Sequence, residues 1–262
     1  MNTLKEILSK LLKGEITLAE AERQVKLLAI EEVGNMARID VNRDCRKGIP
    51  EIILAEGKSA ADVVDIALHV MEEKGRVIVS RCNVEQISAV KATVPSDAVL
   101  RVYDRARMIV LKKKEFAVKP TGGKVGLLTA GTSDIPVAEE AKVIAEEMGC
   151  TVFAAYDVGV AGIHRLMQPI KEFVAQDVDV IIVVAGREGA LPSVVAGMVD
   201  VPVIAVPTSN SYGFGEKGVG TLMAMLQACS LGLAVVNIDS GVAAGAVATI
   251  IANRVAKFRD SV

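Results

Sequence analysis

The sequence predicts an α/β protein whose C-terminal part is a doubly wound, parallel, five-stranded sheet, preceded by a smaller α/β module and a helical hairpin. From position 124 onward, short apolar runs alternate with helical patterns, as in proteins built from strand–helix units. The chain is 51% hydrophobic but only 3% aromatic and has no Trp, so its core is aliphatic. An aliphatic core suits a parallel sheet that is covered on both faces.

The N-terminal part begins with apolar residues at helical spacing over 2–12. A capping box, Thr17 with Glu20, opens a second helix that is expected to reach about Ile30. Ser59 is the expected N-cap of the next helix, with Asp62 at its third position. The elements predicted after it are a helix Ala60–Glu73, a strand Arg76–Ser80, a helix Val84–Thr93 and two short strands within Ala98–Val110.

A charged hinge, Lys112–Pro120, places the expected domain boundary between 118 and 119. Beyond it, the apolar runs predict the strands Lys124–Ala130, Thr151–Asp157, Val178–Ala185, Val201–Val206 and Leu233–Ile238. The helical patterns predict the helices Pro136–Met148, Ile163–Ala175, Pro192–Met198, Val219–Cys229 and Val242–Lys257. The last helix has no charged residue over Val242–Ala252, which predicts that it is buried. An interface between subunits is one place where such burial is expected.

Every predicted strand of this domain ends in glycine with Ser, Thr or charged residues. Because parallel strands end at one edge of a sheet, these segments should line one ligand pocket. The segments are Gly131–Asp134, Asp157–Gly162 followed by His164 and Arg165, Ala185–Gly189, Pro207–Gly215 and Asn237–Gly241. The first of them opens a helix, where unpaired backbone N–H groups favour an anion. Ser133 and Asp134 also fit a simple helix cap at this position.

Composition excludes several classes of function. Lys and Arg total 30 against 32 Asp and Glu, a net charge of −2, so bulk charge does not favour nucleic acid. There is no run of about 18 uncharged apolar residues, as a membrane span needs, and the first residues do not resemble a signal peptide. A cytoplasmic protein with no membrane or nucleic-acid partner is expected. The four cysteines are scattered singly, which predicts neither a zinc site nor a disulfide framework.

Three side chains are candidates for chemistry. Cys229 is predicted at a helix C-terminus, where the helix dipole disfavours a thiolate, so it is either a small core residue or a nucleophile assisted by positive charge from Arg165, Arg187 or a cationic substrate. Glu188 is either a surface carboxylate or a base. His164 is either an acid/base or a first-turn helix residue. In the N-terminal module, Asp40, Arg43, Arg46, Lys58 and Arg81 are either surface charges or contacts to an anionic ligand.

Several segments together resemble the LarB family of nickel-pincer cofactor biosynthesis proteins, the pyridinium-3,5-biscarboxylic acid mononucleotide synthases. They are GTSDIPVAEEA from Gly131, DVGVAGIHR from Asp157, AGREGALP from Ala185, PTSNSYGFG from Pro207, ACSLG from Ala228 and VNID ending at Asp239, with Asp40–Glu51 and Gly57-Lys58 in the first module. The second domain alone is similar to PurE-type aminoimidazole ribonucleotide carboxylases and mutases. The chain departs from the family pattern at Leu231 and over Ser240–Ala244.

The resemblance implies carboxylation of the pyridinium ring of nicotinic acid adenine dinucleotide at C5, with hydrolysis of the phosphoanhydride to release AMP. It assigns Cys229 as the nucleophile that adds to the ring and Glu188 as an essential acidic residue. The residues that it implies for substrate binding are Thr132, Ser133, Asp134, Asp157, His164, Arg165, Arg187, Ser211, Tyr212, Gly213, Asp239, Arg43, Arg46 and Lys58. It implies carbon dioxide or bicarbonate as co-substrate, no tightly bound cofactor and a homo-octamer, and it leaves open whether Mg²⁺ is present at the substrate pyrophosphate.

Two alternatives stay open at this point. An aminoimidazole ribonucleotide carboxylase or mutase would use His164 and need no cysteine, but it would lack the first module and would carry a second His where this chain has Ala190. A non-catalytic nucleotide sensor would bind the same ligand without turnover and would tolerate replacement of Cys229.

Overall fold

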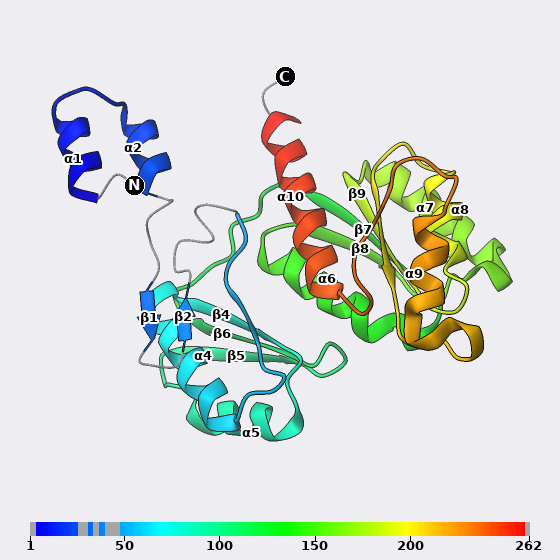
Figure 1. The fold of residues 1–262 in the computed structure, drawn as a ribbon, viewed down its shortest axis with the longest axis horizontal. Coiled ribbons are helices and arrows are strands. Elements are labelled where there is room, and N and C mark those ends of the chain that lie inside the picture. Colours follow the sequence, from blue (N-terminus) through cyan, green and yellow to red (C-terminus); the bar gives the residue numbers. More distant parts are fainter. Residues whose placement is uncertain (1–3, 26–30, 34–36, 40–47, 260–262) are drawn as a thin grey trace. The chain divides into compact units, whose positions relative to one another are not determined.

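The computed structural model describes residues 4–25, 31–33, 37–39 and 48–259, which divide into two compact units. The second unit runs continuously from Ala117. The predicted fold class, α/β with a five-stranded parallel sheet in the C-terminal part, is confirmed (Figure 1).

The first unit begins with the predicted helical hairpin, α1 (Leu4–Leu12) and α2 (Leu18–Val25). The Thr17–Glu20 capping box forms as predicted: Glu20 Oε2 accepts from the Thr17 backbone N–H at 2.9 Å, and Thr17 Oγ1 accepts from the Glu20 N–H at 3.2 Å. The predicted continuation to Ile30 lies outside the described residues. The strands β1 (Glu31–Val33) and β2 (Ala37–Ile39) pair antiparallel.

The rest of this unit is a four-stranded mixed sheet in the order β3-β4-β6-β5. Its elements are β3 (Ile52–Leu54), α4 (Ala60–Lys74), β4 (Arg76–Ser80), α5 (Val84–Thr93), β5 (Ala98–Tyr103) and β6 (Met108–Lys113). Both helices pack through aliphatic side chains onto one core that includes Val70, Val79 and Ile109. The Ser59–Asp62 capping box opens α4 as predicted, and Asn83 with Gln86 forms a second one at α5.

The second unit contains a five-stranded sheet in the order β11-β10-β9-β7-β8, all parallel. Its strands are β7 (Lys124–Thr129), β8 (Thr151–Ala155), β9 (Val180–Ala185), β10 (Val203–Pro207) and β11 (Leu233–Val235). Its helices are α6 (Ile135–Glu147), α7 (His164–Gln176), α8 (Ala190–Ala196), α9 (Val219–Leu226) and α10 (Gly241–Arg259). The predicted helix Val219–Cys229 is three residues too long, because α9 ends at Leu226.

The alternation of side chains along the strands divides the core into two layers. In β9, Ile182 and Val184 pack in the core layer of α6 and α10, whereas Ile181 and Val183 pack in the layer that includes α7, α8 and α9. All six β9 residues are buried, which explains their continuous aliphatic sequence.

The helix α10 is long and apolar enough, by length and composition alone, to cross a membrane, and 44% of its apolar window is buried in the structure. It packs closely on α6. A Cβ on Gly245 would lie 2.6 Å from the Ala141 carbonyl oxygen, so the contact needs glycine. Its other face exposes Val247 and Ile250. It is therefore a one-sided packing helix, and the predicted burial of Val242–Ala252 holds for one face only.

Candidate active site

The carboxyl ends of the five parallel strands meet at one edge of the sheet. The chain turns to β8 after β7 but to β10, on the other side, after β9, so β7 and β9 flank the topological switch point. In doubly wound sheets this is where ligands bind. The segments from Gly131 and from Gly186 therefore occupy the centre of the candidate site.

Asp134 joins two of the strand-end segments. Its side chain is buried, with Oδ2 accepting from the Gly131 N–H at 2.9 Å and Oδ1 accepting from the Thr208 hydroxyl at 2.7 Å. Asn210 Nδ2 donates to the Ser133 carbonyl at 2.7 Å. A Cβ on Gly186 would lie 2.7 Å from Thr208 Oγ1, so glycine is required beside this bond. Asp134 thus holds the segment after β7 against the segment after β10.

The segment after β7 is a 3₁₀ turn, Thr132–Asp134, that runs directly into α6. The predicted side-chain cap is absent, because the Asp134 carboxylate makes no capping hydrogen bond to α6. Thr132 and Ser133 are exposed beside the first turn of the helix. The first residue of α6, Ile135, donates its N–H to the Thr132 carbonyl, and the second, Pro136, has no N–H. The groups that suit a phosphate here are therefore the two exposed hydroxyl side chains of the turn.

Asp157 and Arg165 form an ion pair after β8, with Oδ2 and Nη1 2.6 Å apart and both side chains close to half exposed. Asp157 has a left-handed backbone, with φ 58°, and its N–H donates to Thr129 Oγ1 at 3.0 Å. His164, the first residue of α7, is exposed. The pair holds Arg165 near the edge of the sheet, and ligand anions can compete for it.

Arg187 and Glu188 follow β9 and are both exposed. Arg187 has φ 51°, and its carbonyl accepts a short hydrogen bond from the Thr221 hydroxyl, which fixes the backbone. Its guanidinium carbon lies 4.2 Å from the centroid of the Tyr212 ring, a cation–π contact. Within the described part of the chain, Glu188 has neither a hydrogen bond nor an ion pair. This carboxylate is therefore available to a ligand.

The segment after β10 is closed on itself by Ser211, whose hydroxyl donates to the Gly215 carbonyl at 3.1 Å and accepts from the Gly218 N–H at 2.8 Å. Gly213 has φ 64°, and the Tyr212 side chain is exposed. After β11, Asp239 has φ 53° and accepts from the Ser209 N–H at 2.9 Å. Ser211 and Asp239 thus shape the loop.

Cys229 is exposed, whereas Cys82 and Cys150 are buried, and burial raises the pKa of the Cys150 thiol. Cys229 lies in the connection that enters β11 at its first residue, and so at the amino edge of the sheet, whereas Glu188 follows β9 at the carboxyl edge. Its neighbour Ser230 donates to the Ser193 carbonyl in α8 at 2.7 Å. Because Cys229 lies three residues beyond α9, the predicted effect of the helix dipole is weaker, since it fades within the last turn.

The two candidate catalytic residues are thus related through α8. Glu188 precedes the first residue of this helix by two positions, and Ser193 of the same helix holds the segment that carries Cys229. Sequence reasoning missed Ser193, Thr208 and Thr221, which position these segments. Of the three, Thr208 alone has a sequence feature that could have identified it, because it directly follows a buried strand.

The candidate residues of the N-terminal module are described separately. Arg43 and Arg46, like Asp40, lie outside the described residues. The Lys58 ammonium donates to the Leu54 carbonyl at 2.7 Å, and Arg81 pairs with Glu56 at 3.2 Å. Gln86, which the sequence analysis missed, is buried and donates to the Ala55 and Lys58 carbonyls. These contacts fix the loop after β3.

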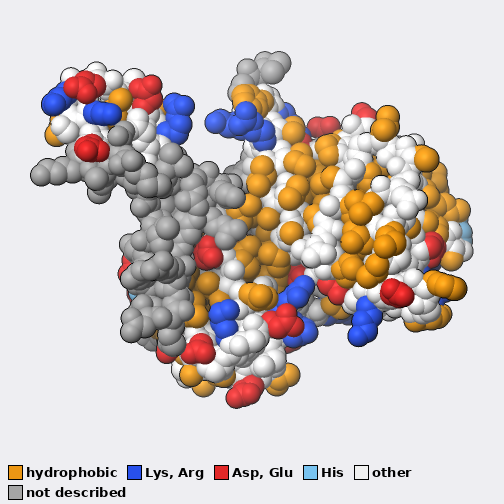
Figure 2. Space-filling view, in the orientation of Figure 1, with side chains coloured by type: hydrophobic (Ala, Val, Ile, Leu, Met, Phe, Trp, Pro, Cys, Tyr) orange, Lys and Arg blue, Asp and Glu red, His pale blue; other side chains and the backbone are white. Residues whose placement is uncertain are grey.

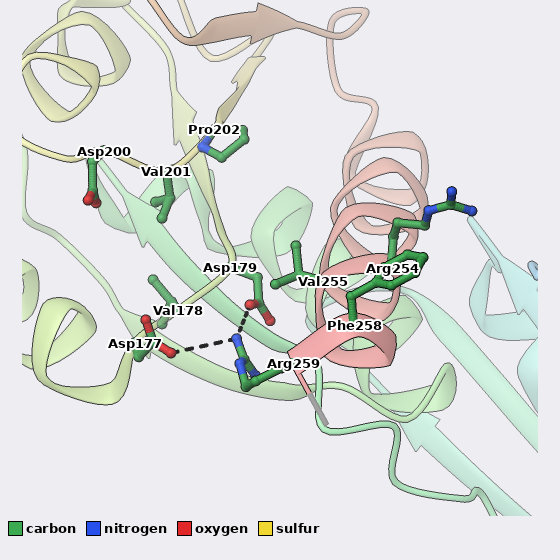
Figure 3. Close-up of a pocket in the computed structure, with 10 residues that line it drawn as sticks. All are labelled: Asp177, Val178, Asp179, Asp200, Val201, Pro202, Arg254, Val255, Phe258 and Arg259. Atoms are coloured by element: carbon green, nitrogen blue, oxygen red, sulfur yellow. Dashed lines mark hydrogen bonds and ion pairs between the residues drawn. The ribbon is translucent and has the colours of Figure 1, made fainter. Parts of the chain in front are cut away.

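A cavity of about 690 Å³ opens at the opposite, amino edge of the C-terminal sheet (Figure 3). Val178, Val201 and Val255 contribute apolar walls, and Arg259 lies between Asp177 and the buried Asp179. None of the predicted site residues lines this cavity. Among the described residues, no group of three or more His, Cys, Asp or Glu side chains is arranged to hold a metal ion.

Comparisons with known proteins cover both units. Residues 30–114 match the LarB/PurE-like N-terminal domain, and residues 124–262 match the AIR carboxylase domain. The chain is 45% identical over 251 residues to an uncharacterized protein of Methanocaldococcus jannaschii, covering 95% of this chain and 96% of the relative. It is 30% identical over 138 residues to N5-carboxyaminoimidazole ribonucleotide mutase of Pyrococcus horikoshii, covering 51% of this chain and 71% of that one.

The mutase of Methanocaldococcus jannaschii is 33% identical over 117 residues, which cover 44% of this chain and 69% of the mutase. The mutases thus match about half of this chain, whereas the LarB/PurE-like N-terminal domain accounts for the preceding module. With both domains matched in this order, the chain belongs to the LarB family, in which a PurE-like domain forms the C-terminal half.

Proposed function

We propose that this protein carboxylates the pyridinium ring of nicotinic acid adenine dinucleotide at C5 and hydrolyses the phosphoanhydride, giving pyridinium-3,5-biscarboxylic acid mononucleotide and AMP. The observation that carries the proposal is the arrangement around α8. The carboxylate of Glu188 lies two residues before this helix, and the residue after the exposed Cys229 bonds to Ser193 within it. A mutase that needs no cysteine would not require this pair.

The proposed chemistry starts from a ring that is an electrophile and cannot itself attack carbon dioxide. The Cys229 thiolate adds to C4, and the ring electrons shift to the nitrogen, giving a neutral dihydropyridine with a nucleophilic C5. C5 attacks carbon dioxide and forms the new carbon–carbon bond. Glu188 accepts the C5 proton, and expulsion of the thiolate from C4 restores the aromatic cation. The net change is carbon dioxide gained and one proton released.

Binding of the dinucleotide is assigned to the strand-end segments. The exposed hydroxyls of Thr132 and Ser133 suit the pyrophosphate. Arg165 can leave its ion pair with Asp157 and pair with a substrate anion instead. We propose that Mg²⁺ enters only with the pyrophosphate, which predicts that chelation slows AMP release. Arg43, Arg46 and Lys58 stay predicted substrate contacts, and the cytoplasmic location stays a prediction.

The decisive experiment is incubation with nicotinic acid adenine dinucleotide, bicarbonate and Mg²⁺, followed by mass spectrometry for AMP and the dicarboxylated mononucleotide. Cys229→Ser is expected to abolish the carboxylated product, and Glu188→Gln to lower its rate by about 100-fold or more. The matched control is Glu216→Gln, which removes an exposed carboxylate from a neighbouring loop and should leave the rate unchanged.

Other outcomes identify the alternatives. Product formation by Cys229→Ser at the wild-type rate would exclude the covalent mechanism. Binding of the dinucleotide without turnover would indicate a sensor. The half-chain similarity to N5-carboxyaminoimidazole ribonucleotide mutases makes that ribonucleotide the second substrate to test. Its turnover by wild type, with no reaction of the dinucleotide, would overturn the proposal in favour of a mutase.

We further propose that the protein assembles as a homo-octamer. Apolar side chains gather over α9 and α10 in Figure 2, and the exposed ones include Met223, Leu226, Val247 and Ile250. Contiguous apolar surface of this kind is typical of interfaces. Light scattering of the full chain should give an octamer, and a monomer would contradict this part of the proposal.

A further inference from the structure

The ring of Tyr212 is a recognition surface that is already occupied by a planar cation. The Arg187 guanidinium stacks on it at 4.2 Å, and Tyr212 is 77% exposed. Both side chains emerge from fixed backbone. The Arg187 carbonyl is held by Thr221, and the segment around Tyr212 is closed by Ser211. Within the described residues, Arg187 has no carboxylate partner.

A guanidinium and a pyridinium ring share the properties that an aromatic face selects. Both are flat, carry one delocalised positive charge and are weakly hydrated for their charge. An exposed cation–π contact is weak, so a second cation of the same shape can replace the first. Arg187 directly precedes Glu188, which accepts the C5 proton of the ring in the proposed function.

We propose that Tyr212 is the platform on which the cationic pyridinium ring stacks, and that the ring displaces Arg187 to do so. This inference rests on the proposed function and deepens it, because it names the residue that reads the charge of the ring. The displaced guanidinium is then free, next to Glu188, to pair with the carboxylate carried by the ring.

Stacking of this kind acts on binding and not on the chemical steps. The ring is a cation in substrate and product but neutral in the covalent intermediate. Tyr212 therefore stabilises the bound substrate and the bound product more than it stabilises the intermediate. Loss of the aromatic face should therefore raise KM while leaving kcat unchanged or slightly raised. A residue needed only for folding of the loop would not produce this split.

The test uses two ligands that differ in the ring charge. The oxidised and reduced forms of nicotinamide adenine dinucleotide share the adenosine, the pyrophosphate and the carboxamide, but only the oxidised ring is a cation. Calorimetric titration of the full chain should show that wild type binds the oxidised form about tenfold more tightly. Tyr212→Leu should reduce this ratio to near unity, and Tyr212→Phe should preserve it.

Phe214→Leu is the matched control, since it removes another fully exposed aromatic ring two residues away and should leave the ratio unchanged. A Tyr212→Leu variant that keeps the wild-type ratio would overturn the inference, and so would a wild type without preference. If wild type binds the dinucleotides with the expected preference but forms no carboxylated product, the proposed reaction fails and the platform stands.

Displacement of Arg187 has a test of its own. The 1-methylnicotinamide cation, methylated on the ring nitrogen, carries the pyridinium charge but no anionic group, so Arg187 can only compete with it for the Tyr212 face. Arg187→Met should bind this probe more tightly than wild type does in a nuclear magnetic resonance titration. Equal or weaker binding by the variant would show that the guanidinium does not compete for the ring.

Discussion

The two edges of the C-terminal sheet both carry charged side chains, but they use them differently. At the amino edge, Arg259 pairs with Asp179, whose side chain is almost completely buried and also accepts from the Lys124 N–H at 2.7 Å. At the carboxyl edge, the Glu188 carboxylate has no hydrogen bond or ion pair among the residues that the structure describes, and the Arg187 guanidinium stacks on the exposed ring of Tyr212. Removal of one partner from a buried ion pair leaves an uncompensated buried charge and destabilises the fold. Exposed charges without a partner are instead available to ligands.

The carboxyl edge also contains committed charges, because Asp157 pairs with Arg165 and Asp239 accepts from the Ser209 N–H. Asp134 is the buried one, and its removal should have the largest effect. Asp134→Ala leaves the Gly131 N–H and the Thr208 hydroxyl without their acceptor, so about 1–3 kcal/mol of stability should be lost. Because the segment positions the substrate, activity should fall by about 100-fold or more. Thermal unfolding and product formation measure the two effects. Asp200→Ala, an exposed carboxylate at the other edge, should change neither.

Removal of one arginine from each edge tests the comparison directly. Arg259→Met leaves the buried Asp179 without its counterion and should cost about 2–4 kcal/mol in urea unfolding, with little effect on substrate affinity. Arg165→Met breaks a half-exposed pair and should cost less than about 1 kcal/mol, but weaken substrate binding. Equal destabilisation by both variants would contradict the distinction between the edges.

Two glycine substitutions separate a crowded position from an open one. A Cβ on Gly186 would displace the Thr208 hydroxyl from Asp134, so Gly186→Ala should cost about 1–2 kcal/mol and lower activity. Gly197→Ala meets its nearest atom at 3.5 Å, an ordinary contact, and is the control. Unchanged activity in Gly186→Ala would show that the loop accommodates the added methyl group.

The smallest effect concerns pH. Burial raises the pKa of Cys150 above its ordinary value of 9.0. The folded state therefore keeps its proton where the unfolded state loses it, so this contribution to stability is complete below pH 9.0 and disappears as the pH rises through the folded pKa. Cys150→Ala should flatten the alkaline fall in the unfolding temperature above pH 9.0. An unchanged slope would mean that another group dominates.

The elements that rest on local pattern could be predicted from the sequence. The aliphatic strands, the helix Val84–Thr93, the Thr17–Glu20 capping box and the Ser59 N-cap follow from hydrophobic periodicity and from residues within one turn of each other. The end of α9 could not be predicted. Ser230 bonds to Ser193, which lies 37 residues earlier in the chain. The chain leaves the helix at Leu226, before it reaches Gly232, where the sequence pattern led us to expect the helix to stop.

The candidate site shows the same limit. The strand ends identified which segments would meet, because parallel strands end at one edge. The partners within the site are long-range: Thr208 lies 74 positions from Asp134, and Tyr212 reaches Arg187 from the next strand end. No local periodicity encodes these contacts. Arg187 and Tyr212 were named singly as substrate contacts, and their stacking required the structure.

The left-handed backbone of Asp157, Arg187 and Asp239 has a consequence for protein engineering. Each of these residues holds a conformation that glycine adopts at lower cost, by about 1 kcal/mol or more per position. A screen for thermostability alone would therefore reward glycine at all three positions. It would enrich variants that have lost three side chains of the carboxyl edge, including the Asp157 partner of Arg165 and the Asp239 acceptor of the Ser209 N–H. Selection on this scaffold has to score turnover and melting temperature together.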